Sequence, residues 1–171
     1  MSRIERGLVS PSFTTRIFAT LDAGGVEYVV VGRIAVQVHG HVRMTNDVDL
    51  IPSPTPDNLA RLADALAGLG ARVLNPGSEH LPVTATMLAR ATSWQFATRL
   101  GNIDVLHDAP GAAPYRQLRE RSLVIELGDH PIAIAGRDDL IRMKRAAGRP
   151  VDLADIAALT EPEHEQAAPD R

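Results

Sequence analysis

The stretch VVVGRIAVQVHGHVRMTNDVDLIP, residues 29–52, places two aspartates one residue apart at the start of an apolar segment. A buried ionised carboxylate is costly unless a cation or several hydrogen bonds compensate its charge. Because side chains alternate along a strand, Asp47 and Asp49 share one face, whereas Val48 and Leu50 point to the other. The pattern therefore predicts a strand that presents two carboxylates on one side and packs into the core on the other.

A divalent metal ion is the compensation that this pattern favours. Residues two apart on a strand are about 6.5–7 Å apart at Cα, close enough for both carboxylates to hold one ion or to bracket two. Oxygen ligands without histidine or cysteine favour Mg²⁺ or Mn²⁺. Two such aspartates alone are also common at solvated strand ends. A third carboxylate, Asp104 between Ile103 and Val105, is expected on a neighbouring strand and strengthens the metal interpretation.

A phosphate site is predicted beside these carboxylates. Gly32 follows a buried valine run and opens a short helical segment, RIAVQVHG. Free backbone N–H groups and the positive end of the helix dipole bind anions at such a turn. A glycine between a strand and a helix is common, so this feature is weak by itself. Together with metal-binding carboxylates it implies a nucleoside triphosphate.

Length and composition limit the overall organisation. The chain has 171 residues, of which 44% are hydrophobic, which predicts a single domain over residues 1–160. Residues 161–171 lack apolar periodicity and are expected to form a disordered acidic tail. The absence of cysteine excludes disulfides, thiolate zinc sites and a cysteine nucleophile. No apolar run approaches the length of a membrane span, so a soluble cytoplasmic protein is expected.

Charge is unevenly distributed along the chain. The net charge of −3 argues against an obligate nucleic-acid-binding protein. Residues 111–150, however, contain seven arginines and Lys144 against five acids, which predicts a modest basic face. Lys144 is the only lysine among 18 basic residues. This position either requires a compact ammonium group or is a chance exception in an arginine-rich composition.

The periodicity of the sequence predicts a mixed α/β (α+β) fold in which helices flank a central mixed sheet and a helical segment lies at the C-terminal end. Glycine and proline residues mark the element boundaries. We expect helices over residues 10–25, 33–40, 55–70, 137–147 and 150–159. We expect strands over residues 27–31, 44–52, 93–100, 103–107, 122–127 and 131–135, with Gly101-Asn102 as the turn of a hairpin.

Residues 30–50 together resemble a known family. The segment from Val30 to Leu50 has a glycine turn, a short helix ending in HG and an aspartate pair, and it resembles the nucleotidyltransferase fold of the polymerase β superfamily. Within that superfamily it is most similar to the minimal toxins of the AbiEii/MenT type. The similarity continues in GNIDVLHDAPG and in DDLIRMKRAAGRPVDLADIAAL. It covers most of residues 25–160, and its motifs are specific in combination.

The resemblance implies an enzyme that moves an NMP from an NTP to an acceptor and releases pyrophosphate. Asp47 and Asp49 would ligate both metal ions, and Asp104 would ligate the catalytic one. Lys144 would contact the triphosphate. The remaining candidates for nucleotide contacts are Gly32, Arg33, Arg43 and Thr45.

The same resemblance implies a biological setting. Related toxins modify the 3′ end of tRNA, so the expected role is that of a toxin in a toxin–antitoxin system. The implied partners are a nucleoside triphosphate, tRNA and a cognate antitoxin protein, with no membrane.

One position departs from the family pattern. Gly32 is followed by Arg33, where the family has glycine or serine. This long side chain either crowds the nucleotide or adds a cation to its phosphates. Two alternatives to a transferase therefore stay open: a catalytically weak or inactive nucleotide-binding module, and a metal-dependent phosphohydrolase.

Some charged residues have simpler structural interpretations. Asp152 and Asp155, three residues apart on the last predicted helix, could orient Lys144 or Arg145. For Asp152 a carboxylate that stabilises the helix start is the preferred interpretation. His39, at a predicted helix end, is expected to bond a backbone carbonyl.

Overall fold

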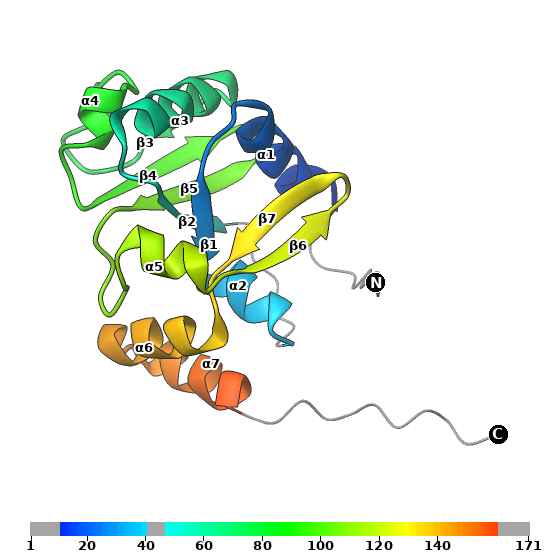
Figure 1. Ribbon diagram of the computed structural model, residues 1–171. Helices are drawn as coiled ribbons and strands as arrows, with labels where there is room; N and C mark the ends of the chain where they lie inside the picture. The colour runs from blue at the N-terminus through cyan, green and yellow to red at the C-terminus, as the bar shows by residue number, and fades with distance from the viewer. Residues whose placement is uncertain (1–10, 41–46, 161–171) are drawn as a thin grey trace.

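A mixed sheet of seven strands runs through the computed structural model of the protein, which describes residues 11–40 and 47–160 (Figure 1). The strand order is β3-β4-β5-β2-β1-β7-β6. Strand β2 is parallel to β5, and β1 is parallel to β7; the other neighbours are antiparallel. The strands are β1 (Tyr28–Val31), β2 (Asp47–Pro52), β3 (Arg72–Val73), β4 (Ser93–Thr98), β5 (Gly101–Leu106), β6 (Leu123–Leu127) and β7 (His130–Ile134).

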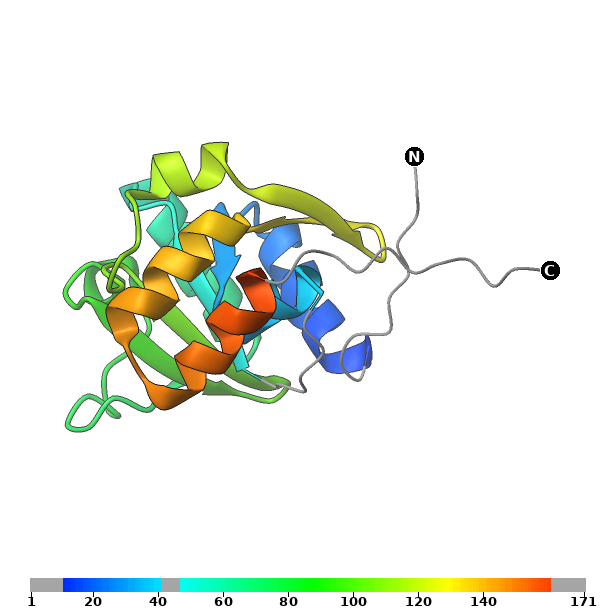
Figure 2. The same ribbon diagram turned by 90° about the horizontal axis from the view of Figure 1, so that it is seen from below.

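Helices flank the sheet. Helices α3 and α4 lie at one end of the molecule and α6 and α7 at the opposite end (Figure 1). Seen from below, α6 and α7 lie side by side (Figure 2). The helices are α1 (Pro11–Ala23), α2 (Gly32–Val38), α3 (Pro56–Gly68), α4 (Ala85–Leu88), α5 (Tyr115–Glu120), α6 (Arg137–Ala147) and α7 (Pro150–Thr160).

The hydrophobic core lies along the central strands. Val29, Val30 and Leu50 are completely buried. In β2 the side chains alternate as expected: Val48 and Leu50 are buried, whereas Asp47 and Asp49 are only partly so. The apolar side of the sheet therefore faces the core, and the other side carries the two carboxylates.

The predicted fold class is confirmed. The expected helices and strands are present over the described residues, with boundaries close to those inferred from glycine and proline. Three short elements were not predicted: β3, α4 and α5. Each is six residues or shorter, too short for periodicity to be recognised. The predicted acidic tail, residues 161–171, lies outside the described residues.

The predicted hairpin exists, but its turn lies two residues earlier. Thr98 pairs with Gly101, so residues 99–100 form the turn and Gly101-Asn102 begin β5. The Thr98 hydroxyl donates to the Gly101 carbonyl at 2.7 Å and accepts from the Leu100 N–H at 3.0 Å. The Thr98 side chain thus stabilises a turn at residues 99–100, whereas the preference of turns for glycine and asparagine predicted it at residues 101–102.

Within the described segments, none of the helices combines the length and the apolar character needed to cross a bilayer.

Candidate active site

Two carboxylates meet where β2 and β5 run side by side. Asp49 pairs directly with Asp104, and Asp47 pairs with Asn102. Neighbouring strands are about 4.8 Å apart, and residues directly opposite one another project to the same face of a sheet. The prediction that Asp104 lies on a strand next to the aspartate pair is confirmed by this register. Asp47, Asp49 and Asp104 therefore share one sheet face.

A glycine turn lies against this face. Val31, the last residue of β1, pairs with Asp49, so the following residue, Gly32, passes directly beside the carboxylate. A Cβ atom at position 32 would lie 2.0 Å from Asp49 Oδ2, and the Gly32 φ angle is +65°. Both the space and the backbone conformation require glycine here. The strand-to-helix turn and the carboxylate face thus form a single site.

Mutual repulsion is visible in the pKa values of the carboxyl groups. Burial and, after it, the negative charges of Asp104 and Asp47 raise the pKa of Asp49 to about 6, against the opposing attraction of Arg33 and Lys144. Burial also raises the pKa of Asp104, with a hydrogen bond from Gln95 opposing the effect and Asp47 adding to it. The three carboxyl groups are therefore within electrostatic reach of one another, as a shared cation site requires.

Gln95 is a neighbour that the sequence analysis did not single out. It pairs with Asp104 across β4 and β5, and its side-chain amide donates to Asp104 Oδ2 at 3.5 Å. Its backbone N–H donates to the Asn75 side chain at 2.7 Å. The alternation of SWQFAT, with Trp94 and Phe96 buried, places Gln95 on the polar face and could have identified it.

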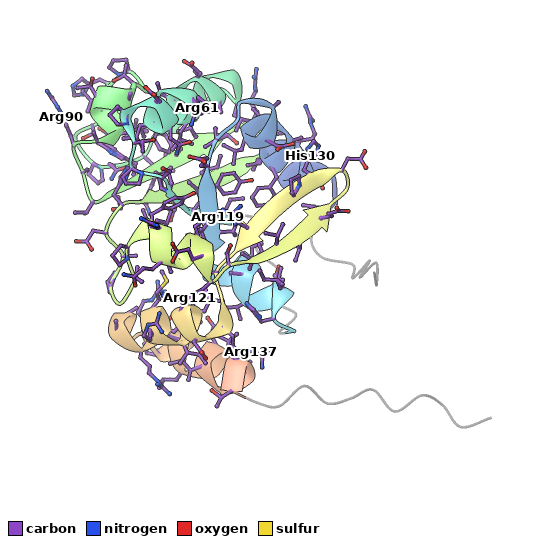
Figure 3. The ribbon with its side chains drawn as sticks, viewed as in Figure 1. Arg61, Arg90, Arg119, Arg121, His130 and Arg137 are labelled. Carbon is purple, nitrogen blue, oxygen red and sulfur yellow. The ribbon has the colours of Figure 1, made fainter. Side chains whose placement is uncertain are left out.

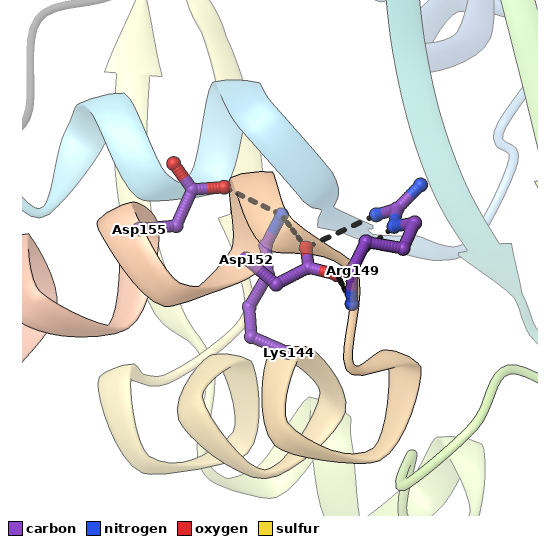
Figure 4. A network of polar contacts seen from close by, with 4 residues as sticks. All are labelled: Lys144, Arg149, Asp152 and Asp155. Atoms are coloured by element: carbon purple, nitrogen blue, oxygen red, sulfur yellow. Dashed lines mark hydrogen bonds and ion pairs between the residues drawn. The ribbon is translucent and has the colours of Figure 1, made fainter.

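The single lysine is buried in a network of acids (Figure 4). Lys144 Nζ lies 2.8 Å from Asp155 Oδ2 and 3.2 Å from Asp152 Oδ1, and Lys144 is only 7% exposed. Arg149 donates to Asp152 through its guanidinium at 2.9 Å and through its backbone N–H at 3.0 Å. Lys144 and Arg149 both interact electrostatically with Asp49. The start of α7 therefore holds Lys144 beside the carboxylate face.

Asp152 combines both roles considered from the sequence. It accepts the Arg149 N–H at the start of α7, as the helix-start interpretation expects, and it also contacts Lys144. The hydrogen bond from Arg149 is the main cause that lowers the pKa of Asp152 to about 2. His39 Nε2 lies 2.9 Å from the Ala135 carbonyl, a backbone contact of the kind predicted for it.

Two predicted site residues, Arg43 and Thr45, lie outside the described residues. Arg33 is exposed at the start of α2. Among residues 11–40 and 47–160, no three His, Cys, Asp or Glu side chains are gathered closely enough to hold a metal ion as they stand. The placement of Asp47, Asp49 and Asp104 on one face is thus observed, whereas their action as a ligand set stays a prediction.

Several basic side chains of residues 111–150 are paired with nearby acids. Figure 3 shows Arg119, Arg121 and Arg137 on the part of the molecule formed by α5 and α6. Arg121 forms a two-point ion pair with the buried Asp139, which Arg142 also contacts. Further pairs join Arg116 to Glu120 and Arg149 to Asp152. The segment offers less free positive charge than its composition indicates.

No family model matches the chain, and no curated protein matches its sequence. Solved structures do resemble it. The lincosamide antibiotic adenylyltransferase LnuA, in a lincomycin-bound crystal structure, aligns with a TM-score of 0.62 at 13% identity over 90% of this chain and 98% of LnuA.

Two further structures give the same result. ANT(2″)-Ia in complex with adenylyl-2″-tobramycin aligns with a TM-score of 0.57 at 15% identity, over 87% of this chain and 86% of that protein. An antigenic nucleotidyltransferase-like protein from Paracoccidioides brasiliensis aligns with a TM-score of 0.53 at 16% identity, over 89% and 77% of the two chains. The chain therefore has the fold of the nucleotidyltransferases.

Proposed function

We propose that the protein is a metal-dependent nucleotidyltransferase that moves an NMP from an NTP to an acceptor hydroxyl. The main observation that supports this proposal is the pairing of Asp49 with Asp104 beside the Gly32 turn. These residues lie on a fold shared with nucleotidyltransferases. In this reaction the acceptor oxygen forms a bond to the α-phosphorus, and the bond from that phosphorus to the pyrophosphate oxygen breaks.

The donor set fits Mg²⁺ or Mn²⁺. Asp47, Asp49 and Asp104 supply oxygen ligands only, as these ions prefer. The raised pKa values of Asp49 and Asp104 mark a place where a cation would relieve repulsion. When bound, such ions would neutralise the triphosphate and lower the pKa of the attacking hydroxyl.

The triphosphate would lie between the Gly32 turn and α6. The ammonium group of Lys144 would neutralise part of its charge, and Asp152 and Asp155 would hold that group in place. Arg33, which already attracts the Asp49 carboxylate, is free to swing onto the phosphates because it is exposed. Arg43 and Thr45 are proposed as further nucleotide contacts on the strength of the sequence resemblance.

For the acceptor we propose the 3′ end of tRNA, and for the biological role a toxin that is neutralised by a cognate antitoxin. The support is the resemblance of the sequence motifs to the AbiEii/MenT-type group. A small hydroxylated compound is the second candidate, favoured by fold neighbours that were solved with lincomycin and with adenylyl-2″-tobramycin.

The test is to incubate the protein and Mg²⁺ with each α-labelled NTP and total cellular RNA. Transfer of the α-label into an RNA band, with release of pyrophosphate, is expected. Asp49→Asn should abolish labelling, whereas Asp64→Asn, which changes an exposed aspartate on α3, should not. Labelling that survives Asp49→Asn would contradict the proposed site.

The alternatives give different products in the same assay. A phosphohydrolase would release labelled NMP and pyrophosphate without a labelled acceptor. An inactive binding module would retain the nucleotide and release nothing. An acceptor other than RNA would appear as label that survives RNase treatment.

A further inference from the structure

The two edges of the sheet differ in how they are protected against pairing with another strand. At one edge β3 is only two residues long and includes the exposed Arg72. At the other edge β6 has five residues, LVIEL, which contain no proline or lysine and a single charge, Glu126. Short strands, proline and charge are the usual protections of a sheet edge. Strand β6 lacks most of them.

The β6 edge is also apolar and exposed. Leu123 is 46% exposed and Val124 is 51% exposed. The β6–β7 hairpin extends from the body of the molecule (Figures 1 and 2), and its pairing with β7 is continuous from Leu123 to Leu127, with no bulge. An unbulged strand of this kind is a template for one more strand.

The hairpin geometry determines which backbone groups face outward. Leu127 and His130 close a two-residue turn, and such turns close on a hydrogen-bonded pair. Hydrogen-bonded and non-hydrogen-bonded pairs alternate along an antiparallel ladder. Pro131, which has no N–H, lies opposite Glu126 and fits a non-hydrogen-bonded pair. Val124 and Glu126 therefore direct their N–H and C=O groups away from β7.

The sequence of this edge is complementary to itself. If two copies of RSLVIELGD, residues 121–129, run antiparallel around Ile125, each outward-facing Val124 meets Glu126 of the second copy. Leu123 then meets Leu127 of the second copy. A shift by two residues in one direction would place Glu126 against Glu126, which is unfavourable.

We propose that the protein self-associates through β6, so that the sheets of two copies join antiparallel about Ile125. Leu123, Ile125 and Leu127 of both copies would form one apolar row, continuous with the pocket that Ile125 and Leu127 line together with Phe18. The shared strand is short, so a weak, concentration-dependent dimer is expected. This inference does not depend on the proposed catalytic activity.

Two charge variants test the interface by sedimentation velocity over a concentration series. Val124→Glu would oppose Glu126 of the second copy twice per dimer and should raise the dimer dissociation constant by roughly 2- to 30-fold. Val124→Lys makes an equally polar change but pairs with Glu126, so it should preserve or tighten the dimer. Leu74→Lys, at an exposed leucine elsewhere, should have no effect. Equal effects of Val124→Glu and Val124→Lys would overturn the proposed register.

Disulfide trapping provides a second test, because the protein has no cysteine. At a non-hydrogen-bonded antiparallel pair the two Cα atoms are about 4.5 Å apart, within the range of roughly 4.4–6.8 Å for a disulfide. Ile125→Cys should therefore give a covalent dimer of twice 18.4 kDa on mild oxidation. In Leu123→Cys the two sulfur-bearing residues would be about 14 Å apart, and no dimer should form. A chain that stays monomeric, with no trapping at position 125, would overturn the proposal.

Discussion

At the scale of single residues, Asp49 is subject both to repulsion by neighbouring carboxylates and to attraction by Arg33 and Lys144. It is partly buried, it pairs with Asp104 between β2 and β5, and the backbone of Gly32 passes against it. Arg33 and Lys144 offset part of its charge but leave its pKa raised to about 6. An ionised carboxylate in this environment lowers the stability of the folded protein unless a cation binds to it. This cost is the physical basis of two predictions.

The first prediction is that Asp49→Asn stabilises the protein in EDTA. Because the pKa of Asp49 is about 6 in the folded state and 3.8 ordinarily, the folded protein carries an electrostatic cost above about pH 6. Below about pH 4 both states are protonated and the cost vanishes. The variant should gain on the order of 1–3 kcal/mol of unfolding free energy at about pH 7.5, and the gain should shrink as pH falls to about 4.

Urea unfolding across this pH range measures the effect. In Mg²⁺ the order should reverse, since the parent gains stability from bound metal and the variant does not. Equal stability of parent and variant at about pH 7.5 in EDTA would contradict the strain assigned to Asp49.

The second prediction concerns Gly32→Ala. The alanine would combine a left-handed backbone conformation with a Cβ overlapping the Asp49 carboxylate, and the expected loss is about 2–4 kcal/mol. Gly148→Ala is the matched control, because Gly148 has a φ of +62° but no neighbour closer than 3.8 Å. It should lose only about 1–2 kcal/mol.

A double-mutant cycle separates the two contributions. With Asp49→Gly as the background, the cost of Gly32→Ala should fall to that of Gly148→Ala, because the overlapping carboxylate is gone. An unchanged cost would show that Asp49 does not limit the space at position 32.

At the scale of elements, α6 and α7 act as a pair joined by Lys144. The lysine lies on α6, and its acid partners Asp152 and Asp155 lie on α7, both almost fully buried. Removing one member of such a group of buried charges leaves the others uncompensated, which is strongly destabilising. The pair of helices therefore presents a fixed ammonium group to the carboxylate face.

The third prediction is that Lys144→Ala loosens this helix pair. It would leave Asp152 and Asp155 buried without their ammonium partner, and the expected loss is about 3–5 kcal/mol at neutral pH. Arg145→Ala, at the exposed neighbouring position, should stay within about 0.5 kcal/mol of the parent. Chemical denaturation of the three proteins measures both; a Lys144→Ala variant as stable as Arg145→Ala would contradict the network.

The sequence was sufficient to predict the helices and strands that have strong local signals. It predicted few of the features that depend on contacts between those elements. Alternation in DVDL and IDV was enough to place Asp47, Asp49 and Asp104 on polar strand faces, because side-chain direction in a strand is a local property. The close approach of the Gly32 backbone to the Asp49 carboxylate and the neutralisation of Arg121 and Arg142 by Asp139 were not predictable, since both depend on tertiary packing. The turn at residues 99–100 was misplaced because the Thr98 side chain outweighed the preference for glycine and asparagine.

At the scale of the whole molecule, the candidate site is gathered from distant parts of the chain. The β1–α2 turn contributes Gly32, adjacent strands contribute Asp49 and Asp104, and the last two helices contribute Lys144 and its acid partners. Parallel pairing of β2 with β5 places the carboxylates together, and α6 lies below the sheet in the view of Figure 1. Each part would act on a different portion of a metal-bound triphosphate.

The most direct test of this account is calorimetric titration of a nonhydrolysable NTP analogue into the full chain, with Mg²⁺ and with EDTA. We expect binding that requires Mg²⁺, that is lost in Asp49→Asn and Asp104→Asn, and that is retained in Asp64→Asn on α3. Lys144→Arg should bind more weakly than the parent, because a guanidinium fork does not reproduce a compact ammonium group. Nucleotide binding of equal strength in EDTA and in both site variants would contradict a metal-dependent site on this face of the sheet.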